Sequence, residues 1–328
     1  MLNGAGSRAS VIGACLALAF VGALRRNAAD SRFAERALTT GDQKAAIYVQ
    51  ERGQGSPIVV LHGGFGGDQG YLWEIARGRE ERCRFIFYDQ RGSRRSPCRP
   101  EDVSFARHVE DLETLRRELD EEAIALVAHS AGVLLACPCL QQHPERVERM
   151  VLVGMAQPKW RFADPDHPGG TPPLDWNDYS SRIEAFHERP EIAAEIEKAG
   201  LDRESLTARE RTDLWRIRFA GANYFHVDRW REVPGVAHFF NPRAGDACRD
   251  LFGTRYDFLD ALREHVDVPI RVIQGTHDFC DFGGRTCQTL FREDAHVEVI
   301  VLQDAGRTHS GSENRAPGSS VEEWACTT

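Results

Sequence analysis

The chain has 328 residues, of which 41% are hydrophobic and 28% charged, a balance typical of globular proteins. Its formal net charge of −9 argues against a nucleic-acid-binding surface. The length allows one large domain or a domain with a substantial insertion, and the sequence contains no internal repeat.

The first 29 residues have the features of a secretory signal or a membrane anchor. Arg8 precedes an apolar run of fourteen residues, VIGACLALAFVGAL, and Arg25 and Arg26 follow that run. Fourteen residues are fewer than the ~20 that cross a bilayer as a helix. We expect an exported or anchored protein that contacts the membrane through residues 1–29. A mis-assigned start would instead leave the protein cytoplasmic.

The nine cysteines do not form a recognisable disulfide framework. Most of them are predicted to be buried free thiols. Cys137-Pro138-Cys139 offers too few ligands for a zinc site, which needs four at suitable spacing. The cysteines therefore do not predict a zinc site.

Short β-rich segments alternate with helical segments along most of the chain. Strands are predicted at 46–51, 57–62, 84–89, 123–128, 149–154, 269–275 and 297–302, and helices at 105–119, 131–143 and 282–293. Such alternation predicts an α/β protein with a mostly parallel sheet covered by helices on both faces.

The segment 156–265 interrupts this alternation. It is charged and helical in character, and it contains four of the six tryptophans. We predict that it is a helical cap inserted into a core formed by residues 40–155 and 266–309. The tail at 310–328 is rich in Gly, Pro and Ser and is predicted to be coil.

Ser130 is the candidate nucleophile. It lies in LVAHSAGVLLA, between a predicted strand and a predicted helix, which places it on a tight turn at the carboxyl edge of the sheet. A sharp turn of this kind needs small neighbours, and Ala128 and Gly132 provide them.

Three motifs give the chain its resemblance to a known family. LHGGFGG at 61–67, FYDQRGSRRSP at 87–97 and the Ser130 turn with its trailing HPERVERMVLVG resemble serine hydrolases of the α/β-hydrolase fold, in particular the proline iminopeptidase group. The resemblance covers about residues 40–306. It implies hydrolysis of a small-molecule or short-peptide substrate through an acyl-serine intermediate, without a cofactor or metal.

The resemblance also implies where the acid and the oxyanion hole lie. Asp278 follows a predicted strand at the place where the family carries its acid, although it could instead cap the helix at 282–293. Asp281 is the alternative acid. The backbone N–H groups of Gly64 and Ala131 are the expected oxyanion hole.

The catalytic base is the point where this chain departs from the family. Relatives carry a histidine directly after an Ala-Gly pair, whereas this chain reads DAGRTHSGSEN, with Arg307 in that position. An arginine stays protonated and cannot act as a base. We expect His309 to take the role, because His296 precedes its strand and His62 shapes the HGG loop. A frameshift near residue 306 would explain both the missing histidine and the coil-like tail.

The substrate is less well defined by the sequence. Family aminopeptidases hold the substrate amine with cap carboxylates, but the position where a glutamate is expected, three residues before Tyr224-Phe225, is Gly221. Other cap glutamates could substitute: Glu184, Glu188 and Glu210. The cap tryptophans suit an apolar acyl group or simply form the cap core. Two alternatives to a peptidase remain, a general carboxylesterase and a catalytically impaired or non-enzymatic binding protein of the same fold.

Overall fold

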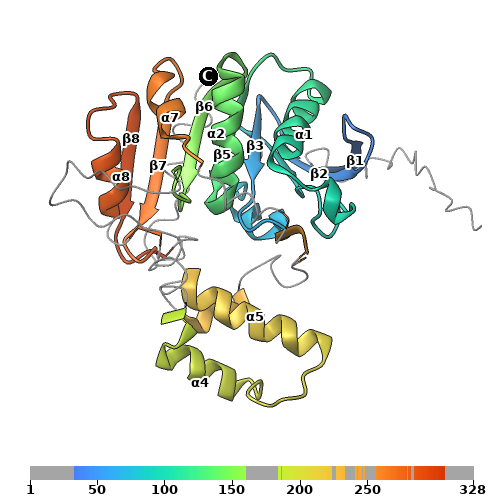
Figure 1. The fold of residues 1–328 in the computed structure, drawn as a ribbon, viewed down its shortest axis with the longest axis vertical. Coiled ribbons are helices and arrows are strands. Elements are labelled where there is room, and N and C mark those ends of the chain that lie inside the picture. The colour runs from blue at the N-terminus through green and yellow to red at the C-terminus, as the bar shows by residue number, and fades with distance from the viewer. Residues whose placement is uncertain are drawn as a thin grey trace, which may run out of the picture.

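The computed structural model describes residues 33–159, 184–185, 187–223, 227–232, 241, 243–245, 247, 256–278, 280–281 and 284–306. Eight strands form a single sheet in the order β1-β2-β4-β3-β5-β6-β7-β8 (Figure 1). Their bounds are β1 Phe33–Thr39, β2 Ala46–Gly53, β3 Pro57–Leu61, β4 Arg84–Tyr88, β5 Ile124–His129, β6 Val147–Val153, β7 Ile270–Gly275 and β8 Val297–Leu302. β2 pairs antiparallel with β1 and β4, and every other neighbouring pair is parallel. The predicted α/β sheet is confirmed.

All seven predicted strands are present, with ends within two residues of the prediction. β1 was not predicted. It is an edge strand, paired along its whole length with β2, and side chains such as Glu35 and Ala37 are exposed. Its sequence, FAERALT, therefore lacks the continuous apolar run by which the buried parallel strands were recognised. The sheet begins at Phe33, earlier than the predicted start of the core at residue 40.

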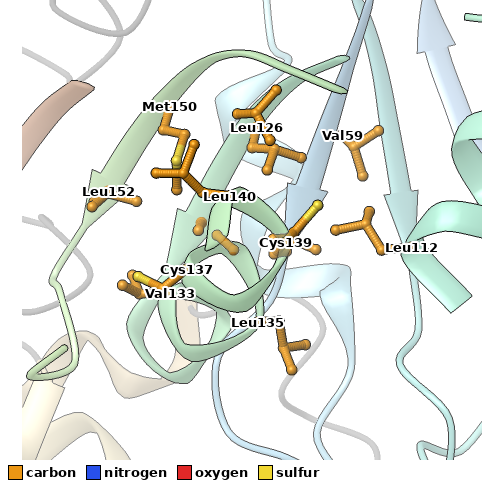
Figure 2. Close-up of a cluster of buried hydrophobic side chains, with 14 of the residues drawn as sticks. Val59, Leu112, Leu126, Val133, Leu135, Cys137, Cys139, Leu140, Met150 and Leu152 are labelled. Atoms are coloured by element: carbon orange, nitrogen blue, oxygen red, sulfur yellow. The ribbon is translucent and has the colours of Figure 1, made fainter. Parts of the chain in front are cut away.

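One face of the sheet is covered by α-helices. These are α1 Phe105–Glu118, α2 Val133–Gln142, α7 Leu259–Glu264 and α8 Arg285–Leu290. The largest apolar cluster lies between them and the strands, and Figure 2 shows part of it, where Leu140 of α2 lies near Met150 of β6 and Leu126 of β5. α2 is buried along most of its length, which explains why it is apolar on all sides.

The other face of the sheet carries a second apolar cluster. Alternate residues of each strand point to it, for example Ala125 and Val127 of β5. Within the described part of the chain, the 3-10 helix η1 Gln69–Ile75 packs there through Leu72. Helices therefore pack on both faces, as predicted.

Three helices from the predicted cap form a cluster of their own. α4 Pro190–Lys198, α5 Ala208–Asn223 and the 3-10 helix η5 Val227–Glu232 surround a core that includes Ile192, Ile217 and Trp230. In Figure 1, α4 and α5 lie apart from the sheet, beyond the edge toward which β7 points. The predicted cap boundaries at 156 and 265 stay a prediction.

Two other predicted segments, 1–29 and 310–328, lie outside the described residues. Among the residues described, no helix is both long and apolar enough to cross a membrane. Of the cysteines in the described residues, five are free thiols, namely Cys98, Cys137, Cys139, Cys280 and Cys287, which agrees with the prediction, whereas Cys83 is bonded in a disulfide.

Pro138 lies inside α2. Its ring nitrogen has no hydrogen to donate to the carbonyl four residues earlier. The helix nevertheless continues to Gln142, and its side chains from Val133 to Leu140 are all buried in the core.

A buried arginine links the loop after β1 to α1. Arg91 is 1% exposed, and its Nε and Nη2 donate to the two carboxylate oxygens of Asp111 at 2.7 and 2.6 Å. Its Nη1 donates to Asp42 at 3.0 Å and to the carbonyl of Asp102 at 2.9 Å. The hydrogen bond from Arg91 keeps the pKa of Asp42 far below its usual value. One guanidinium therefore joins the loop after β1 to α1.

Replacing Asp111 with alanine is expected to lower the free energy of unfolding by about 3–5 kcal/mol, because a buried charge loses its bidentate partner. Urea denaturation measures this. Glu101→Ala is the matched control: its ion pair with Arg99 is exposed, so the expected change is about 0–1 kcal/mol. Equal effects of the two substitutions would contradict the role assigned to Arg91.

Candidate active site

Ser130 lies where β5 ends and the 3-10 helix η3 Ser130–Gly132 leads into α2. Its φ is +56°, a left-handed conformation that is rare for residues with a side chain. Such strain persists only where the surrounding structure enforces it, and it is frequent at functional sites. The side chain is partly exposed at the carboxyl ends of the parallel strands, as the sequence predicted.

Close backbone approach explains the small residues around Ser130. A Cβ on Gly132 would lie 2.6 Å from the carbonyl oxygen of Leu61, and a Cβ on Gly63 would lie 2.5 Å from the Cβ of Ser130. Neither position can accept a side chain without movement of the backbone. Ala128 is fully buried and pairs with Leu61 on β3. The HGG loop after β3 therefore packs directly against the turn of Ser130.

His62 forms a hydrogen bond with the carbonyl of Gly63 in the HGG loop. The backbone N–H of Gln90 donates to His62 Nε2 at 3.1 Å, so the ring proton is on Nδ1, which donates to the carbonyl oxygen of Gly63 at 2.9 Å. Burial lowers the pKa of His62 and keeps the ring neutral. Because C=O and N–H point in opposite directions across a trans peptide, this bond directs the N–H of Gly64 away from His62. The structural role expected for His62 agrees with these contacts.

Gly64 has a φ of +63°, and a Cβ there would meet no atom of the described residues within 4 Å. None of the described residues therefore crowds the amide that was predicted for the oxyanion hole. The other predicted donor, Ala131, is the residue after Ser130 and is partly exposed.

The structure separates the two candidate acids. Both oxygens of Asp281 accept hydrogen bonds from the first turn of α8, from the N–H groups of Thr286 at 2.8 Å and Cys287 at 2.9 Å. Helix capping, considered for Asp278 in the sequence, is thus performed by Asp281. Asp278 is fully buried three residues after β7, and its Oδ1 accepts from the N–H of Cys280 at 2.8 Å.

The segment after β8 lies beside the loop that carries Asp278. The N–H of His277 donates to the carbonyl of Ala305 at 2.9 Å. A Cβ on Gly275 would lie 2.5 Å from the carbonyl oxygen of Gly306, so the two segments touch. The described chain therefore ends at Gly306 beside the loop that carries the candidate acid. Arg307 and His309 themselves lie outside the described residues.

The remaining predicted histidine is remote from this edge. His296 bonds through Nε2 to the carbonyl of Leu262 at 2.8 Å, before β8 begins. The start of a parallel strand lies at the sheet edge opposite to the one that carries Ser130. His296 is therefore not a candidate base, as the sequence indicated.

Of the cap glutamates considered for a substrate amine, one caps a helix and two are exposed. Glu210 accepts from the N–H of Thr207 at 2.8 Å, and Thr207 Oγ1 accepts from the N–H of Glu210 at 3.3 Å, which is a capping box at the start of α5. Glu184 and Glu188 are exposed. Gly221, where the family pattern expects a glutamate, accepts a hydrogen bond from Arg189.

Of the cap tryptophans, Trp230 is 4% exposed, and its indole N–H donates to Glu195 at 3.0 Å. Trp230 belongs to the cap core, one of the two roles considered for these residues. Trp215 stacks on Phe219 with ring centroids 5.2 Å apart. Trp160, Trp176 and the Tyr224-Phe225 pair lie outside the described residues.

The described residues contain no group of three His, Cys, Asp or Glu side chains able to hold a metal ion.

A residue that no sequence motif marks contacts the HGG loop. Tyr71 of η1 accepts a hydrogen bond from the N–H of Gly63 at 2.7 Å. No sequence motif marks it, because the contact depends on how η1 folds back over the sheet.

Comparison with known proteins agrees with this architecture. The chain matches the α/β hydrolase fold family over residues 57–308. It is 27% identical over 305 residues to a proline iminopeptidase of Arabidopsis thaliana, covering 84% of this chain and 74% of that protein. It is 28% identical over 260 residues to a (lyso)-N-acylphosphatidylethanolamine lipase of Bos taurus, covering 76% and 73%.

Solved structures show the same fold. A proline iminopeptidase-related protein of Thermus thermophilus superposes with a TM-score of 0.60 at 22% identity, covering 90% of this chain and 96% of that one. An esterase of Exiguobacterium antarcticum gives a TM-score of 0.60 at 19% identity, covering 84% and 92%. The sheet order, the strained turn at Ser130 and the family match over most of the chain lead to one conclusion: this protein belongs to the α/β hydrolase fold family.

Proposed function

We propose that this protein is a serine hydrolase that cleaves a small ester or amide through an acyl-serine intermediate. The observation that carries the proposal is the left-handed backbone of Ser130, φ +56°, on a turn packed against the HGG loop. Serine hydrolases of this fold present their nucleophile on such a strand-to-helix turn. Relatives named as peptidases, lipases and esterases agree with hydrolysis as the general reaction.

In the proposed reaction, Ser130 Oγ attacks the substrate carbonyl while His309 accepts the hydroxyl proton. The buried carboxylate of Asp278 orients the histidine. The N–H groups of Gly64 and Ala131 stabilise the negative oxygen of the tetrahedral intermediate. The histidine then gives its proton to the leaving group, and water, deprotonated by the same histidine, hydrolyses the acyl-serine.

The base is the least constrained member of the proposed triad. Ala305 and Gly306 lie beside the Asp278 loop, so we expect a histidine at position 307 to reach the acid directly. His309 is two residues further, a span of up to ~7 Å when extended. A working base must come within about 3 Å of the serine oxygen, so the loop has to fold back. Ordering this loop costs about 1–2 kcal/mol per residue. Because this cost lowers the fraction of molecules with His309 in place, we expect weak activity.

Arg307→His is therefore expected to raise kcat for an aryl ester, by about 10²-fold, the lower range for a well-placed general base. His309→Ala is expected to abolish the activity of the unmodified chain. Stopped assays with p-nitrophenyl acetate measure both. If the unmodified chain has a strong activity that depends on His309 and does not respond to Arg307→His, the loop after β8 already places His309 as the base. If neither substitution changes the activity, His309 is not the base.

The substrate class is tested with a panel of aryl esters and aminoacyl anilides, including a prolyl anilide. A proline iminopeptidase-like activity predicts cleavage of the prolyl anilide and a requirement for its free amine. The alternative is a carboxylesterase that needs no amine. Cleavage of esters alone would support the esterase.

A non-enzymatic binding protein of the same fold is the second candidate, and Arg307 is the observation that favours it. The whole panel would then remain uncleaved by the unmodified chain. Binding of a panel member without turnover, detected by calorimetry, would support that function.

A further inference from the structure

We propose that Tyr71 is a positioning residue that couples the HGG loop to the nucleophile strand through His129. This inference rests on the proposed function, because the HGG loop carries the expected oxyanion-hole donor Gly64. Neither Tyr71 nor His129 has a role in the proposed reaction steps. Both residues contact segments next to Ser130, so they can transmit a movement of the HGG loop to it.

The register of β5 places His129 on the same face as η1. Ala125 and Val127 point to the second apolar cluster, and His129 follows two residues later on the same side of the strand. Tyr71 of η1 packs against that cluster. The two side chains therefore meet although 58 positions separate them in the sequence. Their rings form an edge-to-face contact, with centroids 5.2 Å apart and planes at 70°.

Two short hydrogen bonds link the three segments. The N–H of Gly63 donates to the hydroxyl oxygen of Tyr71 at 2.7 Å, and that hydroxyl is 2.6 Å from Nδ1 of His129. His129 is 3% exposed and immediately precedes Ser130. The Tyr71 hydroxyl thus joins η1, the HGG loop and the end of β5 at one point.

The hydrogen bonds of the Tyr71 hydroxyl lie next to the candidate nucleophile, Ser130. A Cβ on Gly63 would lie 3.0 Å from both His129 Nδ1 and Ser130 Oγ, so the hydroxyl network borders the nucleophile. Gly63 is held at its carbonyl by His62 and at its N–H by Tyr71. Glycine has the widest backbone freedom of any residue, and these two bonds restrict it. Removing one would let the amide of Gly64 move, and a shift of about 1 Å at a catalytic group can reduce the rate about 10²-fold.

The test compares Tyr71→Phe with Tyr88→Phe. Tyr71→Phe removes one oxygen and keeps the ring contact with His129. We expect kcat for p-nitrophenyl acetate to fall about 10- to 10²-fold with KM nearly unchanged, because the loop acts on the transition state rather than on the bound substrate. Binding of an aryl boronic acid, which forms a tetrahedral adduct on serine, should weaken by the same factor as kcat/KM.

Tyr88→Phe is the matched control. Tyr88 is 1% exposed, and among the described residues its hydroxyl has no hydrogen-bond partner. Its kinetics should equal those of the unmodified chain. A Tyr71→Phe variant with unchanged kcat, or with a change in KM alone, would overturn the positioning role.

Coupling through His129 is tested with a double-mutant cycle. His129→Leu should lower kcat by a factor similar to Tyr71→Phe, and the double variant should be no slower than the slower single one. His129→Asn keeps a polar atom near the position of Nδ1 and should retain more activity than His129→Leu. Additive losses would show that the two residues act independently, which contradicts the proposed link.

A readout that does not need activity separates this inference from the proposed function. Hydrogen exchange at the Gly63 amide should be faster in Tyr71→Phe than in Tyr88→Phe, with the thermal midpoint of Tyr71→Phe near that of the unmodified chain. An unchanged exchange rate would overturn the inference even in an active enzyme. Faster exchange in a chain that hydrolyses nothing would leave the coupling intact and reject the hydrolase.

Discussion

Replacing Ser130 with alanine is expected to reduce kcat for acyl hydrolysis by about 10⁴-fold or more, because the members of a triad act as a unit and the base has nothing to activate without the hydroxyl. The substitution removes one oxygen from a partly exposed side chain on a turn whose geometry is enforced by Gly63 and Gly132. The fold should therefore be retained, with a thermal midpoint close to that of the unmodified chain.

Ser104→Ala is the control for the same chemical change. Ser104 is the N-cap of α1, and its hydroxyl accepts from the N–H of Arg107 at 3.3 Å. Its loss should cost about 1 kcal/mol of stability and leave kcat unchanged. Retained hydrolysis in Ser130→Ala, measured on any acyl substrate that the unmodified chain cleaves, would reject Ser130 as the nucleophile.

Asp278→Asn is expected to lower kcat about 10⁴-fold, because an amide in place of the carboxylate favours the wrong tautomer of the histidine. Its Oδ1 can still accept from the N–H of Cys280, so the loop should keep its shape. Steady-state assays with the substrate used for Ser130→Ala, together with a thermal melt, measure the two effects separately.

The matched substitution three positions later should show the opposite pattern. Asp281 accepts two N–H groups at the start of α8, and an asparagine there can accept only through its one oxygen. Asp281→Asn should therefore lower stability by about 1 kcal/mol and change kcat little. Loss of activity in Asp281→Asn with normal activity in Asp278→Asn would show that the acid was assigned three residues away from its true position.

The buried strands were predictable because a parallel strand covered on both faces is a continuous apolar run, as in PIVVL at 57–61. β1 was not predictable by that criterion, since its residues pair on one side only and half of its side chains face solvent. The tight turn at Ser130 was predictable from its small neighbours, and the structure supplies the reason: the backbone of Leu61 leaves no room for a Cβ on Gly132.

The preference for Asp278 over Asp281 came only from the resemblance to the family, because both residues follow β7 and both precede a helix. The choice depends on which carboxylate faces the first turn of α8, and that is a matter of loop geometry. The role of Glu210 was visible in principle, because Thr207 three residues earlier completes a capping-box pattern. Tyr71 was not visible, because its contacts join residues far apart in the chain. The base at His309 stays a prediction.

Covalent labelling of the 328-residue chain with a fluorophosphonate tests the central claim most directly, because the reagent reacts with a serine that a working base has activated. We predict a single adduct by intact mass, mapped to the peptide that contains Ser130 and absent in Ser130→Ala. Labelling should be faster in Arg307→His. No adduct in either the unmodified chain or Arg307→His, or an equal adduct in Ser130→Ala, would contradict the assignment of Ser130 as an activated nucleophile.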